Sequence, residues 1–150
     1  MTNTNLTQTY ETFLRASPKQ VWEALTGPEH TARYFFGTRI SVEPRVGGRI
    51  AYTTPDGTLM VDGEVLKFTE GVELECTWRT HYDPSCAGEV STVKWKLEPR
   101  GEATKLTTVH ELEGAANTAR NVADDGWAVV LSSMKTLVET GTPLMVGGKA

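Results

Sequence analysis

The sequence predicts an α+β fold in which a seven-stranded, curved antiparallel sheet wraps around a long C-terminal helix. Three observations lead to this prediction. Much of the chain alternates polar and apolar residues, as strands with one buried face do. Short turn segments separate these stretches, which makes neighbouring strands antiparallel. The chain ends on an amphipathic helix, and a sheet with one apolar face must be covered by such an element.

A strand and two short helices open the chain. The alternation of residues 7–15 predicts the strand. Ser17 then suits a helix N-cap, with proline at the first helical position and Gln20 where a capping-box partner belongs. A Gly-Pro pair ends this helix, and a second short helix is predicted over 29–35. Both helices therefore lie between the first and second strands.

Six further strands follow, separated by turn-forming segments such as RVGG, PDG and PRGE. Gly63 is predicted to mark a β-bulge in the third of them. We expect the six strands at 38–44, 48–54, 58–68, 72–82, 89–98 and 104–112.

The segment DDGWAVVLSSMKTLVETG, residues 124–141, reads as one helix with a single apolar stripe. Asp124 and Asp125 lie near its N-terminal end, where negative charge is favoured, and Gly141 ends it. A terminal helix of some two dozen residues, roughly 35 Å long, would cross a whole curved sheet. The stripe comprises Trp127, Val130 or Leu131, Met134, Leu137 and Val138.

Length and composition predict a single domain over residues 1–150, with 39% hydrophobic and 23% charged residues. The net charge of −4 argues against nucleic acid as a partner. No apolar stretch is long enough to span a bilayer, so no membrane partner is expected. The first residues lack the features of a signal peptide, which predicts a cytoplasmic protein.

No motif indicates a cofactor, a metal or a catalytic group. There is no phosphate-binding glycine loop before a helix, and no Gly-x-Ser-x-Gly turn. Two cysteines are too few for a disulfide framework; Cys76 lies in a strand pattern, and Cys86 is expected to be exposed in a turn. A zinc site built from Cys86, His81 and His110 would be poorly spaced. An enzymatic role is therefore less favoured than binding, although it stays open.

The order of elements resembles the START-like or SRPBCC superfamily, whose fold is called the helix-grip. Five stretches resemble the branch named for the C-terminal domain of the activator of Hsp90 ATPase: ASPKQVWEALTGPEHTARYF, PRVGGRI, DGEVLKFTEGVELECTW, TKLTTVHELEG and GWAVVLSSMKTLVE. The resemblance covers almost the whole chain. It implies a cavity between sheet and helix, in which members of the superfamily bind lipids, sterols, polyketides or hormones.

Strand alternation identifies the residues that face such a cavity. They are rich in Trp and Tyr, which either fill the core or line a pocket for a flat, apolar molecule. Phe35 and Phe36 are further aromatic candidates. His110 shares the inward face, where it is a neutral hydrogen-bonded residue, a ligand contact or a proton shuttle, whereas His81 faces outward. The predicted ligand-binding residues are Tyr52, Trp78, Tyr82, Trp95, His110, Trp127, Leu131 and Met134.

Three functions are compatible with this pattern. The first is non-enzymatic binding of a small hydrophobic or aromatic molecule between the sheet and the terminal helix. The second is a protein-interaction or chaperone-modulating module, which predicts a protein partner or a homodimer. The third is a cyclase- or hydrolase-like enzyme that uses His110 with Tyr82 or Tyr52.

Overall fold

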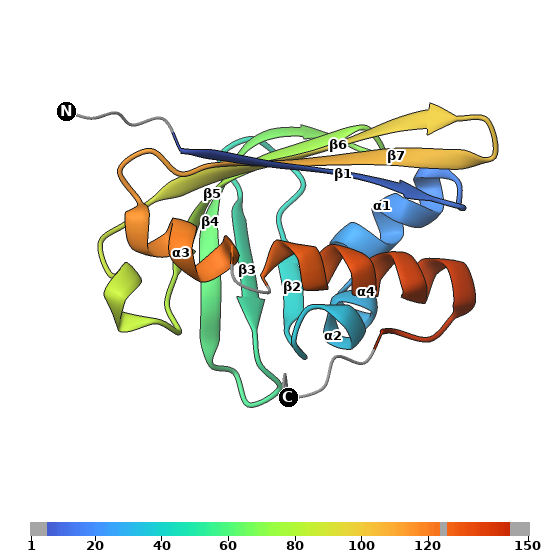
Figure 1. Ribbon diagram of the computed structural model, residues 1–150. Coiled ribbons are helices and arrows are strands. Elements are labelled where there is room, and N and C mark those ends of the chain that lie inside the picture. The colour runs from blue at the N-terminus through green and yellow to red at the C-terminus, as the bar shows by residue number, and fades with distance from the viewer. Residues whose placement is uncertain (1–5, 124–125, 145–150) are drawn as a thin grey trace.

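The structure, a computed structural model, describes residues 6–123 and 126–144, and its main feature is one seven-stranded sheet (Figure 1). The strand order is β1-β7-β6-β5-β4-β3-β2, and every neighbouring pair is antiparallel. The predicted sheet is thereby confirmed. The strands are β1 (Thr7–Leu14), β2 (Arg39–Val42), β3 (Arg49–Thr53), β4 (Leu59–Thr69), β5 (Glu73–Thr80), β6 (Ser91–Arg100) and β7 (Ala103–Glu111).

Four α-helices and one 3₁₀ turn complete the described chain. In Figure 1 the sheet bends strongly, and α4 runs along its concave side beneath β1, β6 and β7. The helices α1 and α2 close one end of this concave side, and α3 lies near the other. The bounds are α1 (Pro18–Thr26), α2 (Pro28–Tyr34), η1 (Pro84–Cys86), α3 (Ala116–Ala123) and α4 (Trp127–Thr140).

The start of α1 forms as its sequence predicts. The hydroxyl of Ser17 accepts a hydrogen bond from the Gln20 main-chain N–H (3.2 Å). In return, the Gln20 side-chain oxygen accepts one from the Ser17 N–H (3.0 Å). Two N–H groups that have no partner within the helix are thus satisfied by side chains close in sequence.

The predicted C-terminal helix is confirmed, but it is shorter than the expected two dozen residues. The helix α4 has 14 residues, about 21 Å of length, and a separate helix α3 precedes it. Gly126 stands where the chain passes close to α3: a Cβ atom there would lie 2.2 Å from the main-chain oxygen of Val122. Asp124 and Asp125 lie outside the described residues. The C-terminal end is as predicted, because Gly141 adopts the left-handed conformation (φ +86°) and caps α4.

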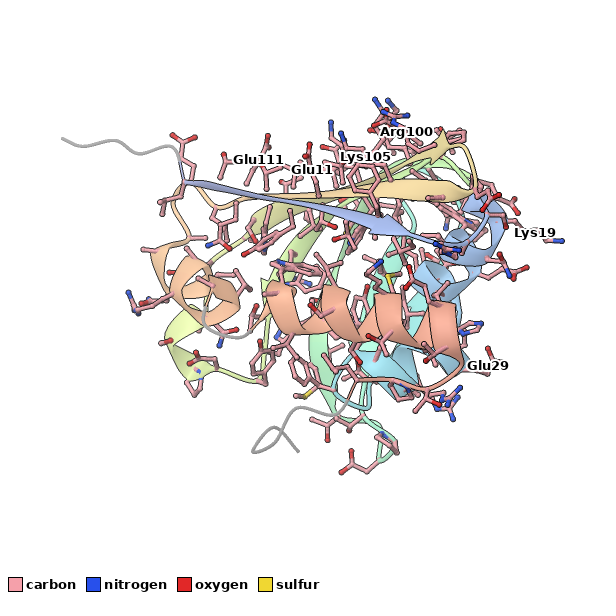
Figure 2. The ribbon with its side chains drawn as sticks, turned by 45° about the vertical axis from the view of Figure 1, so that its right-hand side comes forward. Glu11, Lys19, Glu29, Arg100, Lys105 and Glu111 are labelled. Atoms are coloured by element: carbon pink, nitrogen blue, oxygen red, sulfur yellow. The ribbon has the colours of Figure 1, made fainter. Side chains whose placement is uncertain are left out.

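The alternation of inward and outward residues holds along most of the sheet. The buried set facing α4 includes Leu74, Cys76, Trp78, Val93, Trp95, Leu97, Leu106, Thr108 and His110. Charged side chains occupy the opposite face: Figure 2 shows Glu11, Lys105, Glu111 and Arg100 pointing away from α4. There Lys105 Nζ lies 3.3 Å from a carboxylate oxygen of Glu11.

Two local predictions need correction. Gly63 does not mark a bulge, because the β4–β5 register continues past it and shifts between Val65 and Lys67. Glycine is required at 63 by a close approach, since a Cβ atom would lie 1.8 Å from the main-chain oxygen of Thr77. Cys86 is buried rather than exposed, because η1 packs against α3.

Among the residues that the structure describes, none belongs to a helix with the length and hydropathy of a membrane span.

Candidate ligand-binding cavity

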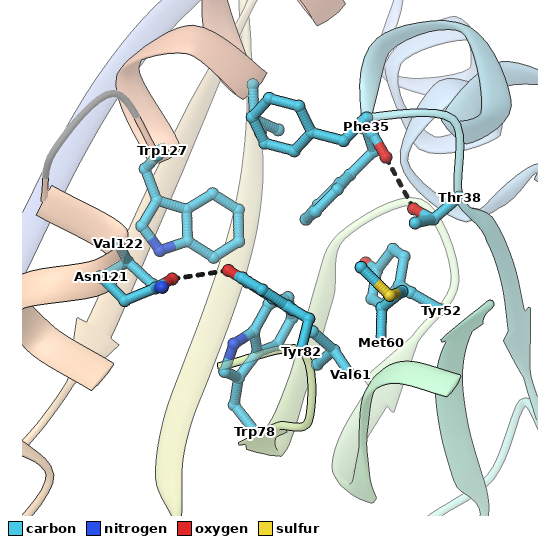
Figure 3. A pocket seen from close by; sticks show the side chains of 13 residues that line it. Phe35, Thr38, Tyr52, Met60, Val61, Trp78, Tyr82, Asn121, Val122 and Trp127 are labelled. Atoms are coloured by element: carbon cyan, nitrogen blue, oxygen red, sulfur yellow. Dashed lines mark hydrogen bonds between the residues drawn. The ribbon is translucent and has the colours of Figure 1, made fainter. Parts of the chain in front are cut away.

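A cavity of about 310 Å³ remains between the sheet and the helices after the core is packed (Figure 3). Strands β3, β4 and β5 form one wall, and the turn after α2 together with α3 and α4 forms the other. Its volume is at the lower end of the range of small-molecule sites. It is lined by Phe35, Phe36, Thr38, Tyr52, Met60, Val61, Trp78, Tyr82, Asn121, Val122, Gly126, Trp127 and Val130.

Aromatic rings form the inner walls of this cavity. The ring centroid of Phe35 lies 4.6 Å from that of Tyr52 and 6.0 Å from that of Trp127. Trp78 completes the group, 5.5 Å from Tyr52 and 5.4 Å from Trp127. A guest molecule here would touch flat π surfaces, which pack well against other aromatic rings.

Two exposed aromatic side chains border the cavity. Phe36 is 46% exposed and adopts a positive φ of 52°, a conformation uncommon for a residue with a side chain. Tyr82 is 48% exposed, and its hydroxyl donates a hydrogen bond to the side-chain oxygen of Asn121 on α3 (2.5 Å). Asn121 also donates to Asp83 Oδ2 (3.0 Å). The segment after β5 is thus joined to α3 at the cavity mouth, as Figure 3 shows for Tyr82 and Asn121.

The structure brings half of the predicted ligand-binding residues to the cavity. Tyr52, Trp78, Tyr82 and Trp127 line it. Trp95, Leu131 and Met134 instead border a narrow gap deeper in the core, which has no room for a water molecule. His110 is fully buried and borders neither space.

The buried His110 forms a hydrogen bond with the indole of Trp127. Trp127 Nε1–H donates a hydrogen bond to His110 Nδ1 (2.9 Å), so the proton of the neutral imidazole is on Nε2. That nitrogen lies 2.7 Å from Ser91 Oγ, which itself lies within hydrogen-bond distance of the Trp78 main-chain oxygen (3.3 Å). The chain of bonds runs from Trp127 through His110 and Ser91 to Trp78.

The protonation state of His110 follows from its burial. Desolvation lowers its pKa from 6.5 to about 3. The imidazole is therefore neutral at physiological pH, and both of its nitrogens are engaged within the protein. This arrangement agrees with the simplest of the three sequence-based interpretations, a neutral hydrogen-bonded residue. It gives no support to a proton shuttle that reaches the cavity.

Several lining residues were missed by sequence reasoning. Met60 and Val61 lie on β4, where the expected bulge at Gly63 made the alternation unusable. Asn121 and Val122 belong to α3, which was not predicted as a separate helix. The signal that could have found them is Gly126, a helix breaker within the stretch interpreted as one helix.

The outer face of the sheet carries a cluster of polar side chains that was not predicted from the sequence. Asp62 is buried on β4 and accepts hydrogen bonds from Arg79 (2.9 Å), Arg49 (3.2 Å) and His81 (2.7 Å). Burial alone would raise the pKa of Asp62, but these donors hold it below its ordinary value. His81 thus faces outward as predicted, on the side of the sheet away from the cavity.

The fold and the cavity together define a class of protein: a helix-grip, START-like domain. Within that class, the family model described as "Activator of Hsp90 ATPase homolog 1-like protein" matches residues 15–139. The chain belongs to this family. The resemblance seen in the sequence is thereby confirmed.

Solved structures with the same fold include three from different organisms. Protein MLL2253 from Mesorhizobium loti is 25% identical, with a TM-score of 0.72 over 89% of this chain and 96% of that one. The Aha1 dimer from Colwellia psychrerythraea is 22% identical, with a TM-score of 0.68 over 91% and 98%. PFC0360w, described as an HSP90 activator from Plasmodium falciparum, is 18% identical, with a TM-score of 0.62 over 82% and 91%. No curated protein matches the chain significantly.

Proposed function

We propose that this protein binds a small aromatic or hydrophobic molecule in the cavity between its sheet and α4, without chemical change to that molecule. The observation that carries the proposal is the cavity of about 310 Å³ bordered by Phe35, Tyr52, Trp78 and Trp127. A core whose only role is stability is packed without such a space, because each void sacrifices van der Waals contacts.

The lining favours binding over catalysis. Among the described residues, the cavity is bordered by aromatic and aliphatic side chains, the thioether of Met60, three hydroxyl groups and one amide, and by no carboxylate, lysine, arginine or histidine. General acid–base chemistry needs a titratable group within reach of the reacting atom. The tyrosine hydroxyl of Tyr52 remains protonated, because burial raises its pKa well above 10. Orientation by ring contacts is what this lining can supply.

The first test uses N-phenyl-1-naphthylamine, an uncharged aromatic probe whose fluorescence rises in apolar surroundings. We expect the wild-type protein to bind it and to unfold at a higher temperature in its presence. At a probe concentration 100 times Kd, the expected stabilisation is about 2.7 kcal/mol. Fluorescence titration and thermal unfolding measure the two effects.

A cavity-filling variant locates the bound probe. Val130→Phe places a ring into the cavity from α4, where Val130 is buried, and should abolish binding while the protein remains folded. Val46→Phe is the matched control, since Val46 is exposed and is not one of the lining residues. Equal binding by wild type and Val130→Phe would contradict the proposed site.

A protein-interaction role is the second candidate. It is favoured by the exposed rings of Phe36 and Tyr82, which border the same cavity mouth and would be covered in a complex. The Colwellia neighbour is described as a dimer, and the Plasmodium neighbour as an HSP90 activator. Sedimentation of this protein over a wide concentration range tests self-association: a constant monomer mass would exclude a dimer at those concentrations.

A further inference from the structure

One tyrosine hydroxyl lacks a hydrogen-bond partner among the residues that the structure describes. The chain has four tyrosines. Tyr10 donates to Gln8, Tyr34 to the main-chain oxygen of Ala24, and Tyr82 to Asn121. The hydroxyl of Tyr52 makes no hydrogen bond with any other residue in 6–123 or 126–144, although Tyr52 is only 2% exposed. This hydroxyl is not fully enclosed, because the fully buried and unpaired side-chain oxygens among the described residues are those of Thr80 and Thr108.

The position of Tyr52 limits where a partner can come from. Tyr52 borders two spaces, the cavity and the narrow gap beneath it. The gap has no room for a water molecule, so water cannot satisfy the hydroxyl from that side. Of these two spaces, only the cavity can admit a molecule.

The surrounding rings determine the shape of that molecule. Phe35 and Trp78 pack against Tyr52, with ring centroids 4.6 Å and 5.5 Å from that of Tyr52, and lie 6.3 Å from each other. Both rings also line the cavity. A flat aromatic frame in the cavity can lie against such surfaces and bring one polar atom to the tyrosine.

We propose that the ligand is a flat aromatic molecule bearing a hydrogen-bond acceptor, such as a carbonyl oxygen, and that the Tyr52 hydroxyl donates to this acceptor. The inference rests on the proposed function and names the ligand class for the same cavity. This hydroxyl also selects against molecules without an acceptor, because such a molecule would cover the hydroxyl without forming a hydrogen bond with it.

Two probes with one frame test this inference. 1-Acetylnaphthalene carries a carbonyl oxygen, and 1-ethylnaphthalene has nearly the same shape without it. Tyr52→Phe should weaken binding of the acetyl probe by about tenfold and change binding of the ethyl probe by less than about twofold. The affinities are measured by quenching of tryptophan fluorescence, since Trp78 and Trp127 line the cavity.

Tyr34→Phe serves as the matched control for stability. Tyr34 is equally buried, but its hydroxyl has a protein partner, the Ala24 oxygen at 2.8 Å. Without ligand, Tyr34→Phe should lower the melting temperature, whereas Tyr52→Phe should leave it unchanged or raise it. A drop for Tyr52→Phe as large as that for Tyr34→Phe would overturn the inference.

The outcomes separate this inference from the proposed function. If the wild-type protein binds neither naphthalene probe, the proposed function fails, and the assignment to Tyr52 fails with it. If the wild type binds both probes and Tyr52→Phe leaves their affinity ratio unchanged, the cavity binds aromatic molecules and only the role of Tyr52 is overturned. A selective loss of the acetyl probe supports both.

Discussion

At the scale of single residues, Trp127 joins the cavity to the packed core. It lines the cavity, and its N–H group donates to the buried His110. Strand alternation was sufficient to predict that Trp78, Trp95 and His110 face α4. The hydrogen bonds that join His110 to Ser91 and Trp127, the latter as donor, could not be predicted, because they depend on how β6, β7 and α4 are placed.

The buried His110 should make stability depend on pH. Its pKa is about 3 when folded and near 6.5 when unfolded, so the unfolded chain binds the proton first as pH falls. The free energy of unfolding should therefore decrease from about pH 6.5 towards pH 3, by about 1 kcal/mol per pH unit. Above pH 7 the same group should have no effect.

His110→Gln isolates this effect. The Gln side chain can accept from Trp127 and donate to Ser91, as the neutral imidazole does, but it does not titrate. Urea denaturation between about pH 4.5 and pH 7.5 should show a smaller slope for the variant than for the wild type. Identical slopes would contradict a lowered pKa of His110 in the folded protein, because the other titrating groups contribute equally to both proteins.

At the scale of elements, the helices α1 and α3 begin in different ways. The cap of α1 is local and was predicted from Ser17 and Gln20. The cap of α3 comes from Glu89, whose carboxylate accepts hydrogen bonds from the main-chain N–H groups of Asn117 (3.2 Å) and Thr118 (2.8 Å). A cap supplied from 28 residues away leaves no signal in the local sequence, which is one reason why α3 was missed.

Loss of this remote cap should loosen one wall of the cavity. Burial alone would raise the pKa of Glu89, but the bonds to Thr118 and Asn117 hold it below its ordinary value. Glu89→Ala should lower stability by about 1 kcal/mol, as removal of a helix cap does, and should weaken binding of the naphthylamine probe. Hydrogen exchange should become faster in α3 and remain unchanged in α1.

Glu98→Ala is a suitable control for that variant. Glu98 pairs with Arg100 on β6, and in Figure 1 the β6–β7 hairpin lies at the opposite end of the sheet from α3. Its removal should leave both exchange in α3 and probe affinity unaltered. Equal effects of the two substitutions would show that Glu89 acts through overall charge rather than as the cap of α3.

At the scale of the whole molecule, the architecture could be predicted from the sequence, whereas the position of the cavity could not. Alternating strands and one apolar helical stripe were sufficient to predict a sheet closed by α4. They could not show that Leu131 and Met134 would pack tightly against Trp95, while space remained beside the N-terminal end of α4. Packing of this kind depends on the bend of the sheet and on the break before Trp127, which alternation does not encode.

The most direct test of the cavity as a binding site is a nuclear magnetic resonance titration of the four tryptophan indole N–H groups with N-phenyl-1-naphthylamine. Trp78 and Trp127 line the cavity, whereas Trp22 packs against Phe68 and does not. The N–H signals of Trp78 and Trp127 should shift with a shared saturation curve while that of Trp22 stays in place. Shifts at Trp22 alone, or none at all at high probe concentration, would contradict the account.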